Sequence, residues 1–274
     1  MSKIPVSVLV TTRNEERRIV SCLEALSDFS EIVVIDSASS DHTADLAQGK
    51  RARVVPFSWD GAYPKKRQWC LDRLMLAHEW ILFIDADEIM TPALVHEIRS
   101  VLQAPACNGY FIKGSYVIAD KVLRYGLCNN KLILFDRRRF RFPEVDDLDI
   151  EGMGEMEGHY QPQAIDGASI GQLRNRLLHH AYDGGEGWES RHRRYAVWEA
   201  DMNRRNAWPA DPVRSRQLLK RIFRAAPGRP LIAFLYGYIW RGGFLDGRAG
   251  WRLARDRYRY YALVARSRQY KAGQ

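Results

Sequence analysis

The chain has 274 residues, of which 46% are hydrophobic and 27% charged, and its formal net charge is +9. This length and composition exclude a disordered chain and a small disulfide-bonded domain, because enough apolar side chains are present to build a full core. The four cysteines, Cys22, Cys70, Cys107 and Cys128, stand far apart and form no C-x-x-C pair. This spacing argues against a zinc site or a disulfide framework and suits a reducing compartment.

The positive charge is concentrated toward the C-terminus. From Arg204 onward seventeen Lys and Arg stand against three acids, a net +14, which leaves −5 for residues 1–203. A region this basic is expected to seek a negative partner, with anionic lipid and nucleic acid as the candidates. The segment Met1–Pro5 lacks the long apolar core of a signal peptide, and no apolar run is long enough to cross a bilayer, so we expect a cytoplasmic protein.

Strand-like and helix-like segments alternate over the first hundred residues. The expected elements are a strand over Val6–Val10, a helix over Glu15–Leu26, a strand over Glu31–Ile35, a helix from Thr43, a strand over Arg53–Val55, a helix opened by Pro64 that reaches Met75, and a strand over Trp80–Ile84. This alternation predicts a parallel sheet covered by helices.

The pattern changes after an expected helix over Pro92–Leu102. The segments Gly109–Ile118 and Lys131–Phe135 are rich in Tyr, Phe, Ile and Leu and have no helical pattern between them, which predicts a mixed or antiparallel extension of the sheet. Residues 141–180 show little periodicity and contain much Gly, Asp and Glu, as is typical of functional or mobile segments. A helical pattern returns from about residue 187.

Polar loops that carry acids follow three of the expected strands. Asp36 closes the second strand, Asp85, Asp87 and Glu88 follow the strand that ends at Ile84, and the loop after the first strand carries Glu15. Ligands gather at the carboxyl ends of parallel strands, and a divalent cation would relieve the repulsion among clustered carboxylates. Helix capping explains each loop taken singly, but three loops together favour a binding site.

Three segments resemble the signature blocks of inverting family-two glycosyltransferases. They are Val6–Glu16, Glu31–Thr43 and Phe83–Glu88, and their order and spacing agree as well. Within that family they are most similar to bacterial enzymes that glucosylate the lipopolysaccharide core. The resemblance implies an α/β fold of the GT-A (Rossmann-like) type, with a mixed, mostly parallel sheet flanked by helices. It also implies a nucleotide-sugar donor, with uridine diphosphate as the favoured nucleotide.

The same resemblance implies roles for individual residues. The expected donor-binding residues are Thr11, Arg13, Glu15, Asp36, Ser37, Lys66 and Asp85. Asp36 is expected to read the base, Asp85 to touch the ribose and Lys66 to contact a phosphate. Asp87 is expected to bind Mg²⁺ or Mn²⁺, because a bound cation stabilises the charge that grows on the departing diphosphate.

An inverting transfer also needs a carboxylate that takes the proton of the acceptor hydroxyl. By the resemblance Glu155 fits this role best, and Glu157 is the alternate, since an extended backbone points both to one face. Two solvated loop acids are the competing interpretation. His179 is a candidate metal or diphosphate ligand by the same resemblance, although a lone histidine is more often structural.

We expect a catalytic domain over residues 1–203 and a basic, amphipathic helical region over 204–274. In that region Trp251, Ala254, Tyr258, Tyr261 and Ala265 would form one helical stripe, opposite Arg252, Arg255, Arg259 and Arg266. Aromatic residues opposite arginines suit a membrane interface, which predicts peripheral binding to an anionic surface at the inner face of the cytoplasmic membrane. Packing of this stripe on the protein itself is the alternative.

The leading hypothesis is a metal-dependent inverting glycosyltransferase that moves a sugar from a nucleotide sugar to a lipopolysaccharide core or another lipid-linked glycan acceptor. A sugar-phosphate nucleotidyltransferase is one alternative, but it would want a Gly-rich phosphate loop where this chain has Thr11–Glu15. A nucleic-acid-binding protein is the other, but no recognised binding motif is present, and we expect no nucleic-acid partner.

Overall fold

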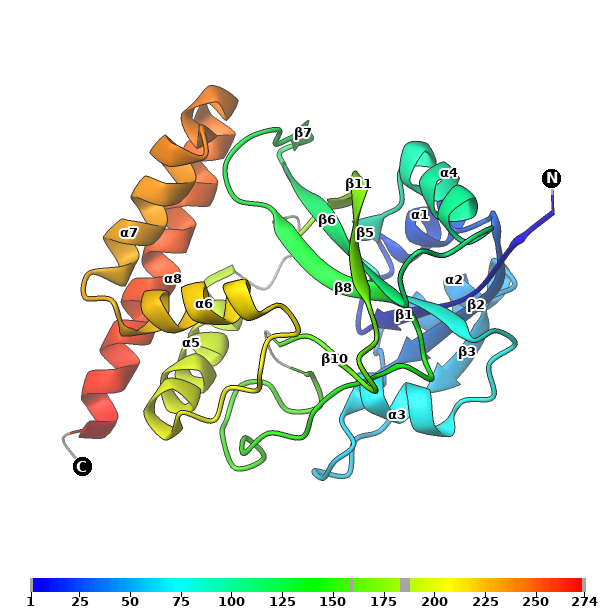
Figure 1. Ribbon diagram of the computed structural model, residues 1–274, viewed down its shortest axis with the longest axis horizontal. Coiled ribbons are helices and arrows are strands. Elements are labelled where there is room, and N and C mark those ends of the chain that lie inside the picture. Colours follow the sequence, from blue (N-terminus) through cyan, green and yellow to red (C-terminus); the bar gives the residue numbers. More distant parts are fainter. Residues whose placement is uncertain (1, 158–159, 183–187, 273–274) are drawn as a thin grey trace.

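The computed structural model describes residues 2–157, 160–182 and 188–272. A nine-stranded sheet in the order β3-β2-β1-β4-β8-β6-β11-β5, with β7 paired to β6, forms its centre, and β9 pairs with β10 outside that sheet. Figure 1 shows the sheet between helices α1, α2 and α4 on one side and the C-terminal helices on the other.

The N-terminal half is parallel, as the alternation of strands and helices predicts. Its strands are β1 (Ile4–Thr12), β2 (Phe29–Asp36), β3 (Arg53–Pro56) and β4 (Trp80–Asp85), and its helices are α1 (Ile19–Glu24), α2 (Thr43–Gly49), α3 (Lys66–Arg73) and α4 (Pro92–Val101). β1 pairs in parallel with β2 and with β4, and its apolar residues are buried because helices cover the sheet. The prediction that the third helix reaches Met75 is wrong: α3 ends at Arg73, and Met75 is 87% exposed.

The second half makes the sheet mixed, which confirms the expected extension. Its strands are β5 (Glu88–Ile89), β6 (Gly109–Ile118), β7 (Lys121–Val122), β8 (Asn129–Asp136), β9 (Phe140–Arg141), β10 (Gln163–Ala164) and β11 (Ile170–His179). β8 runs antiparallel to both β4 and β6, whereas β11 runs parallel to β6. The ten-residue strand β11 lies in the segment that shows little periodicity. It buries only Leu173 and Leu177, so no apolar run marks it in the sequence.

Helices make up the rest of the described chain. They are α5 (Trp188–Arg205), α6 (Arg214–Ala225), α7 (Arg229–Leu235), the π-helical turn η1 (Tyr236–Trp240), the 3₁₀ turn η2 (Gly243–Asp246) and α8 (Arg248–Ala272). α8 packs along α5 and α7 (Figure 1). In the described chain, no helix combines the length and the apolarity that crossing a membrane requires.

The expected boundary between residues 203 and 204 falls inside α5, and contacts join the two sides of it. Glu199 of α5 pairs with Arg229 of α7 and accepts a hydrogen bond from the Tyr260 hydroxyl of α8 at 2.7 Å. All three side chains are buried. The division of the chain into two domains stays a prediction.

The stripe that the sequence predicts on the last helix does not form one exposed face. Ala254 is buried and Tyr261 packs edge-on against Phe223 of α6, whereas Trp251 and Tyr258 are exposed. The buried face of α8 consists instead of Leu253, Ala254, Tyr260 and Val264. α8 therefore uses most of its apolar surface to pack on the protein itself, and exposed apolar residues gather elsewhere.

Candidate active site

The polar loops after β1, β2 and β4 meet at one edge of the sheet, as predicted. In the parallel register Thr12 lies opposite Asp36, and Thr11 lies opposite Asp85. The Thr11 hydroxyl donates a hydrogen bond to Asp85 Oδ1 at 2.9 Å. The three signature segments therefore contribute to a single site.

The loop after β2 is shaped by its own carboxylate. Asp36 is buried and accepts hydrogen bonds from the backbone N–H of Ser39 at 3.0 Å and from its hydroxyl at 2.5 Å. Ala38 between them has φ 52°, a left-handed conformation that turns the chain sharply. The buried hydroxyls of Thr12 and Ser37 have no hydrogen-bond partner among the described residues. Both hydroxyls lie beside Asp36 at this edge of the sheet.

Glu15 and Arg13 differ in their surroundings. The backbone N–H of Glu15 donates to Thr43 Oγ1 at 2.8 Å, and its carboxylate accepts from Arg18 Nη1 at 2.9 Å. Burial raises the pKa of Glu15, although Arg18 opposes this shift. Arg13 is exposed on the same loop. Glu15 thus ties the loop after β1 to α2, and its contact with a nucleotide stays a prediction.

Asp85 lies between two cations. Lys131 Nζ is 2.7 Å from Asp85 Oδ2, and Arg67 Nη2 is 3.1 Å from Oδ1. Burial alone would raise the pKa of Asp85, but Lys131 and Arg67 hold it well below its usual range. With Thr11 as a third donor, the carboxylate of Asp85 is committed to protein partners, and binding of the ribose by this group stays a prediction.

Lys131 lies in the candidate site although the sequence does not single it out. Its Nζ also lies 2.6 Å from Glu88 Oε1, and the other oxygen of Glu88 accepts a hydrogen bond from the backbone N–H of Asp85 at 3.1 Å. Leu82 pairs with Leu134 in the antiparallel register of β4 and β8, and three further residues bring Asp85 beside Lys131. The sequence signal is a lysine at the start of an apolar strand, which gains meaning only once that pairing is known.

Asp87 and His179 face each other. Asp87 Oδ2 lies 3.4 Å from His179 Nε2, because β5 pairs with the end of β11 so that Glu88 is opposite His179. The His179 ring stacks on Tyr116 of β6 at 5.3 Å between ring centroids. Its buried Nδ1 has no hydrogen-bond partner in the described part of the chain.

This pair offers two ligands to a divalent cation whose remaining coordination positions would be filled by the bound substrate. Among the described residues, no three His, Cys, Asp or Glu side chains lie close enough together to hold a metal ion. Mg²⁺ and similar cations are commonly bound by one or two protein groups together with substrate phosphates. The imidazole nitrogen Nε2 of His179 next to the Asp87 carboxylate would supply such a partial set. Metal binding by Asp87 and His179 stays a prediction.

A cavity opens beside Asp87. It has a volume of about 290 Å³ and is lined by Arg17, Arg18, Ser21, Ala86, Asp87, Ile89 and His180. Arg17 brings an exposed positive charge to this lining, which suits a negatively charged group, whereas Arg18 already pairs with Glu15. Both arginines follow the signature segment Val6–Glu16, and the sequence does not single them out.

The two base candidates, Glu155 and Glu157, contact the first residues of α3, but their environments differ. Lys66 Nζ is 2.5 Å from Glu155 Oε1, and the Glu155 side chain is 21% exposed. Glu157 is buried, and its Oε1 accepts the backbone N–H of Gln68 at 3.0 Å. Burial raises the pKa of Glu157, although Arg67 opposes this shift. The extended backbone that the sequence predicts here is wrong, because residues 151–155 form a turn. The orientation of both carboxylates to one face stays a prediction.

Removing the charge of Lys131 is expected to destabilise the fold. Lys131→Met leaves the carboxylates of Asp85 and Glu88 close together without their shared cation, which should cost about 3–5 kcal/mol in the free energy of unfolding. Lys50→Met, which breaks the exposed pair with Glu24, is the matched control and should cost less than about 1 kcal/mol. Urea unfolding measures both values, and equal losses would show that Lys131 does not hold the site together.

Comparison with known proteins agrees with this geometry. A model of glycosyl transferase family 2 matches residues 7–151. A lipopolysaccharide core biosynthesis glycosyltransferase, LpsC, of Rhizobium meliloti is 35% identical over 107 residues, which are 37% of this chain and 38% of that protein. An uncharacterized glycosyltransferase of Rickettsia bellii is 32% identical over 106 residues, 38% of this chain and 35% of the relative. The chain thus spans less than two fifths of the length of these relatives.

A solved structure supports the fold over the whole chain. The mannosyltransferase PcManGT of Pyrobaculum calidifontis, in complex with GDP-Man and Mn²⁺, has a TM-score of 0.55 and 15% identity. The match covers 99% of this chain and 88% of that one. At this identity the likeness concerns the fold alone, and it confirms the predicted fold class.

Proposed function

Because the chain belongs to glycosyl transferase family 2, we propose that it is a metal-dependent inverting enzyme that transfers a sugar from a nucleoside-diphosphate sugar to a lipid-linked glycan. The observation that carries this proposal is the junction of the three signature loops at one sheet edge, where Asp87 faces His179 beside a cavity with arginines on its wall. Such a site offers polar groups for a nucleoside and positive charge for a diphosphate. The name of the relative LpsC favours a lipopolysaccharide core as the acceptor.

The donor would lie along the edge formed by the loops after β1, β2 and β4. Asp36 and the unpartnered hydroxyl of Ser37 lie where a base and ribose would bind, and Asp85 is oriented by Thr11 and Lys131. Asp87 and His179 would hold Mg²⁺ or Mn²⁺, and the cation, when bound, would offset the charge that develops on the departing diphosphate. This arrangement assigns the acids of the Asp85–Glu88 segment to donor binding and not to proton transfer.

Glu155 is the base in this proposal. The acceptor oxygen attacks the anomeric carbon from the face opposite the diphosphate, its proton passes to the Glu155 carboxylate, and the bond to the diphosphate breaks. The Glu155 side chain is partly exposed, so an acceptor hydroxyl can approach it. Glu157 is buried and bonded to the backbone of α3, which suits a residue that supports the start of this helix.

The proposed acceptor and donor would meet at a membrane. We propose that it acts at the inner face of the cytoplasmic membrane, where a lipid-linked acceptor and a soluble nucleotide sugar can meet. The charge of +14 from Arg204 onward supports this location, because it would attract anionic lipid.

A panel of nucleotide sugars tests the donor proposal. We expect one uridine diphosphate sugar to raise the melting temperature in the presence of Mn²⁺ and to raise it much less after EDTA is added. The reason is that Asp87 and His179 would hold a cation that offsets the charge of the diphosphate. Adenosine diphosphate sugars serve as the control for the base. No shift with any nucleotide sugar, or release of pyrophosphate from a nucleoside triphosphate, would contradict sugar transfer by this site.

A further inference from the structure

The α7–η1 segment exposes a row of large apolar side chains. The row consists of Leu231, Ile232, Leu235, Tyr236, Ile239 and Trp240. Their spacing places them on one helical face, while Ala233 and Gly237 on the other face are buried. Trp240 is 83% exposed, and η2 adds the exposed residues Phe244 and Leu245. We refer to these eight side chains as the apolar ridge.

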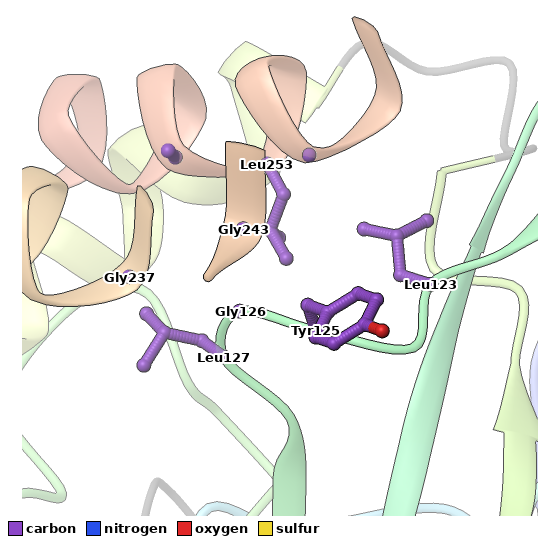
Figure 2. A pocket seen from close by; sticks show the side chains of 9 residues that line it. Leu123, Tyr125, Gly126, Leu127, Gly237, Gly243 and Leu253 are labelled. Carbon is purple, nitrogen blue, oxygen red and sulfur yellow. The ribbon is translucent and has the colours of Figure 1, made fainter. Parts of the chain in front are cut away.

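The ridge is fixed to the sheet and is not a loose tail. Figure 2 shows Gly237 and Gly243 against the loop that carries Tyr125, Gly126 and Leu127. The cavity between them has a volume of only about 10 Å³. A Cβ atom on Gly243 would lie 2.7 Å from the carbonyl oxygen of Gly237, so this close approach requires glycine.

Hydrogen bonds complete this attachment. The buried carboxylate of Asp246 accepts the backbone N–H groups of Arg124 and Tyr125 at 3.3 and 2.9 Å. The backbone N–H of Gly126 donates to the carbonyl oxygen of Arg241 at 2.9 Å. Exposure of the ridge is therefore a property of the folded protein.

The C-terminal region that carries the ridge is cationic. Four arginines of the region, Arg214, Arg221, Arg241 and Arg248, are exposed, and within the described ranges none of the four pairs with a carboxylate. The only acids from residue 204 onward, Asp211, Asp246 and Asp256, all have buried carboxylates. The region thus presents arginine and apolar side chains to solvent without exposed negative charge.

We infer that the apolar ridge docks on an anionic lipid bilayer, with Ile239 and Trp240 entering the interface and the neighbouring arginines meeting lipid phosphates. Tryptophan and tyrosine beside leucine and isoleucine are the side chains that favour the boundary between head groups and acyl chains. Each cation near an anionic surface adds further attraction. A second copy of the chain is a poorer occupant, because it would bring two cationic surfaces together.

The ridge also lies close to the candidate active site. The loop that holds it follows β6 and β7, and the backbone N–H of Leu123 in this loop donates to the carbonyl oxygen of Tyr116 at 2.9 Å. Tyr116 stacks on His179, and Arg257 of α8 donates a hydrogen bond to the Tyr116 hydroxyl at 2.6 Å. Docking would therefore hold this edge of the sheet near the bilayer. The membrane location and the delivery of a lipid-linked acceptor rest on the proposed function, whereas vesicle binding by the ridge is measured without donor or acceptor.

Co-sedimentation of the full chain with vesicles tests the inference. We expect the chain to bind phosphatidylcholine vesicles that contain phosphatidylglycerol, and we expect this binding to weaken as salt is added. Binding to vesicles of phosphatidylcholine alone should be much weaker. The double variant Ile239→Ser, Trp240→Ser should weaken binding by about tenfold or more, because two large apolar side chains no longer enter the interface. Met75→Ser, at an exposed apolar residue outside the basic region, is the matched control and should bind like the parent chain.

Two results would overturn the inference. One is equal binding of the parent chain and the double variant to the anionic vesicles. The other is absence of vesicle binding together with a concentration-dependent dimer, seen by sedimentation velocity, that the double variant abolishes, since the ridge would then bind a second copy. Nucleotide binding should be unchanged in the double variant, so its measurement separates failure of membrane docking from failure of the proposed function.

Discussion

Asp87→Asn is expected to lower sugar transfer by about 100- to 1,000-fold and to remove the Mn²⁺-dependent part of nucleotide binding. The substitution keeps the size of the side chain but takes away the negative charge that faces His179 at 3.4 Å. Of the two proposed protein ligands of a divalent cation, only His179 would then remain unchanged, and the single carboxylate would be lost. Calorimetric titration with uridine diphosphate, with and without Mn²⁺, measures the binding.

The same substitution at Asp120 provides the matched control. Asp120 is exposed in the turn between β6 and β7 and has φ 59°, a conformation that asparagine tolerates equally well. Asp120→Asn is expected to leave both transfer and nucleotide binding unchanged. Undiminished Mn²⁺-dependent binding in Asp87→Asn would show that Asp87 is not a metal ligand.

Glu155→Gln and Glu157→Gln are expected to have very different effects on transfer. Loss of a general base typically costs 10²- to 10⁴-fold, so Glu155→Gln should reduce kcat by roughly that factor while donor binding stays close to that of the parent chain. Glu157→Gln should keep nearly full activity, because its amide oxygen can still accept the hydrogen bond from the backbone of Gln68. Steady-state kinetics with an acceptor glycan measures both variants.

The pair of variants also decides between the two candidates if the assignment is reversed. Each substitution is nearly isosteric and removes the charge of one carboxylate that contacts the start of α3. Either variant therefore serves as the control for the other. A large loss of kcat in Glu157→Gln with little loss in Glu155→Gln would move the base to Glu157. The melting temperature of each variant separates a loss of activity from a loss of folded protein.

Local sequence patterns predict the N-terminal half of the molecule well. Apolar runs such as Val33–Ile35 and Ile81–Ile84 are buried in a sheet covered by helices, so hydrophobicity and strand position coincide there. The parallel arrangement and the family are confirmed. β11 escapes this reasoning, because a strand that buries only two apolar residues resembles a loop in the sequence.

Surface properties are harder to predict than the core. The sequence alone indicates that the region from Arg204 is basic and rich in aromatic residues, but not which apolar side chains face solvent. The stripe on α8 is partly covered by α5 and α7, while the residues from Leu231 to Trp240 are left exposed. Helical periodicity identifies a face, and only packing against neighbouring helices decides whether that face is covered.

The sequence by itself determined the fold class, the family and the acids at the strand ends, because each depends on short, contiguous patterns. Only the tertiary structure decided which partners those acids have. Lys131 and Asp85 are 46 residues apart in the sequence, and the antiparallel pairing of β4 with β8 brings them together. His179 contacts Asp87 because it lies at the end of β11, a strand that the sequence does not mark. Such pairings are set by the packing of the whole sheet, so they lie beyond the reach of local sequence patterns.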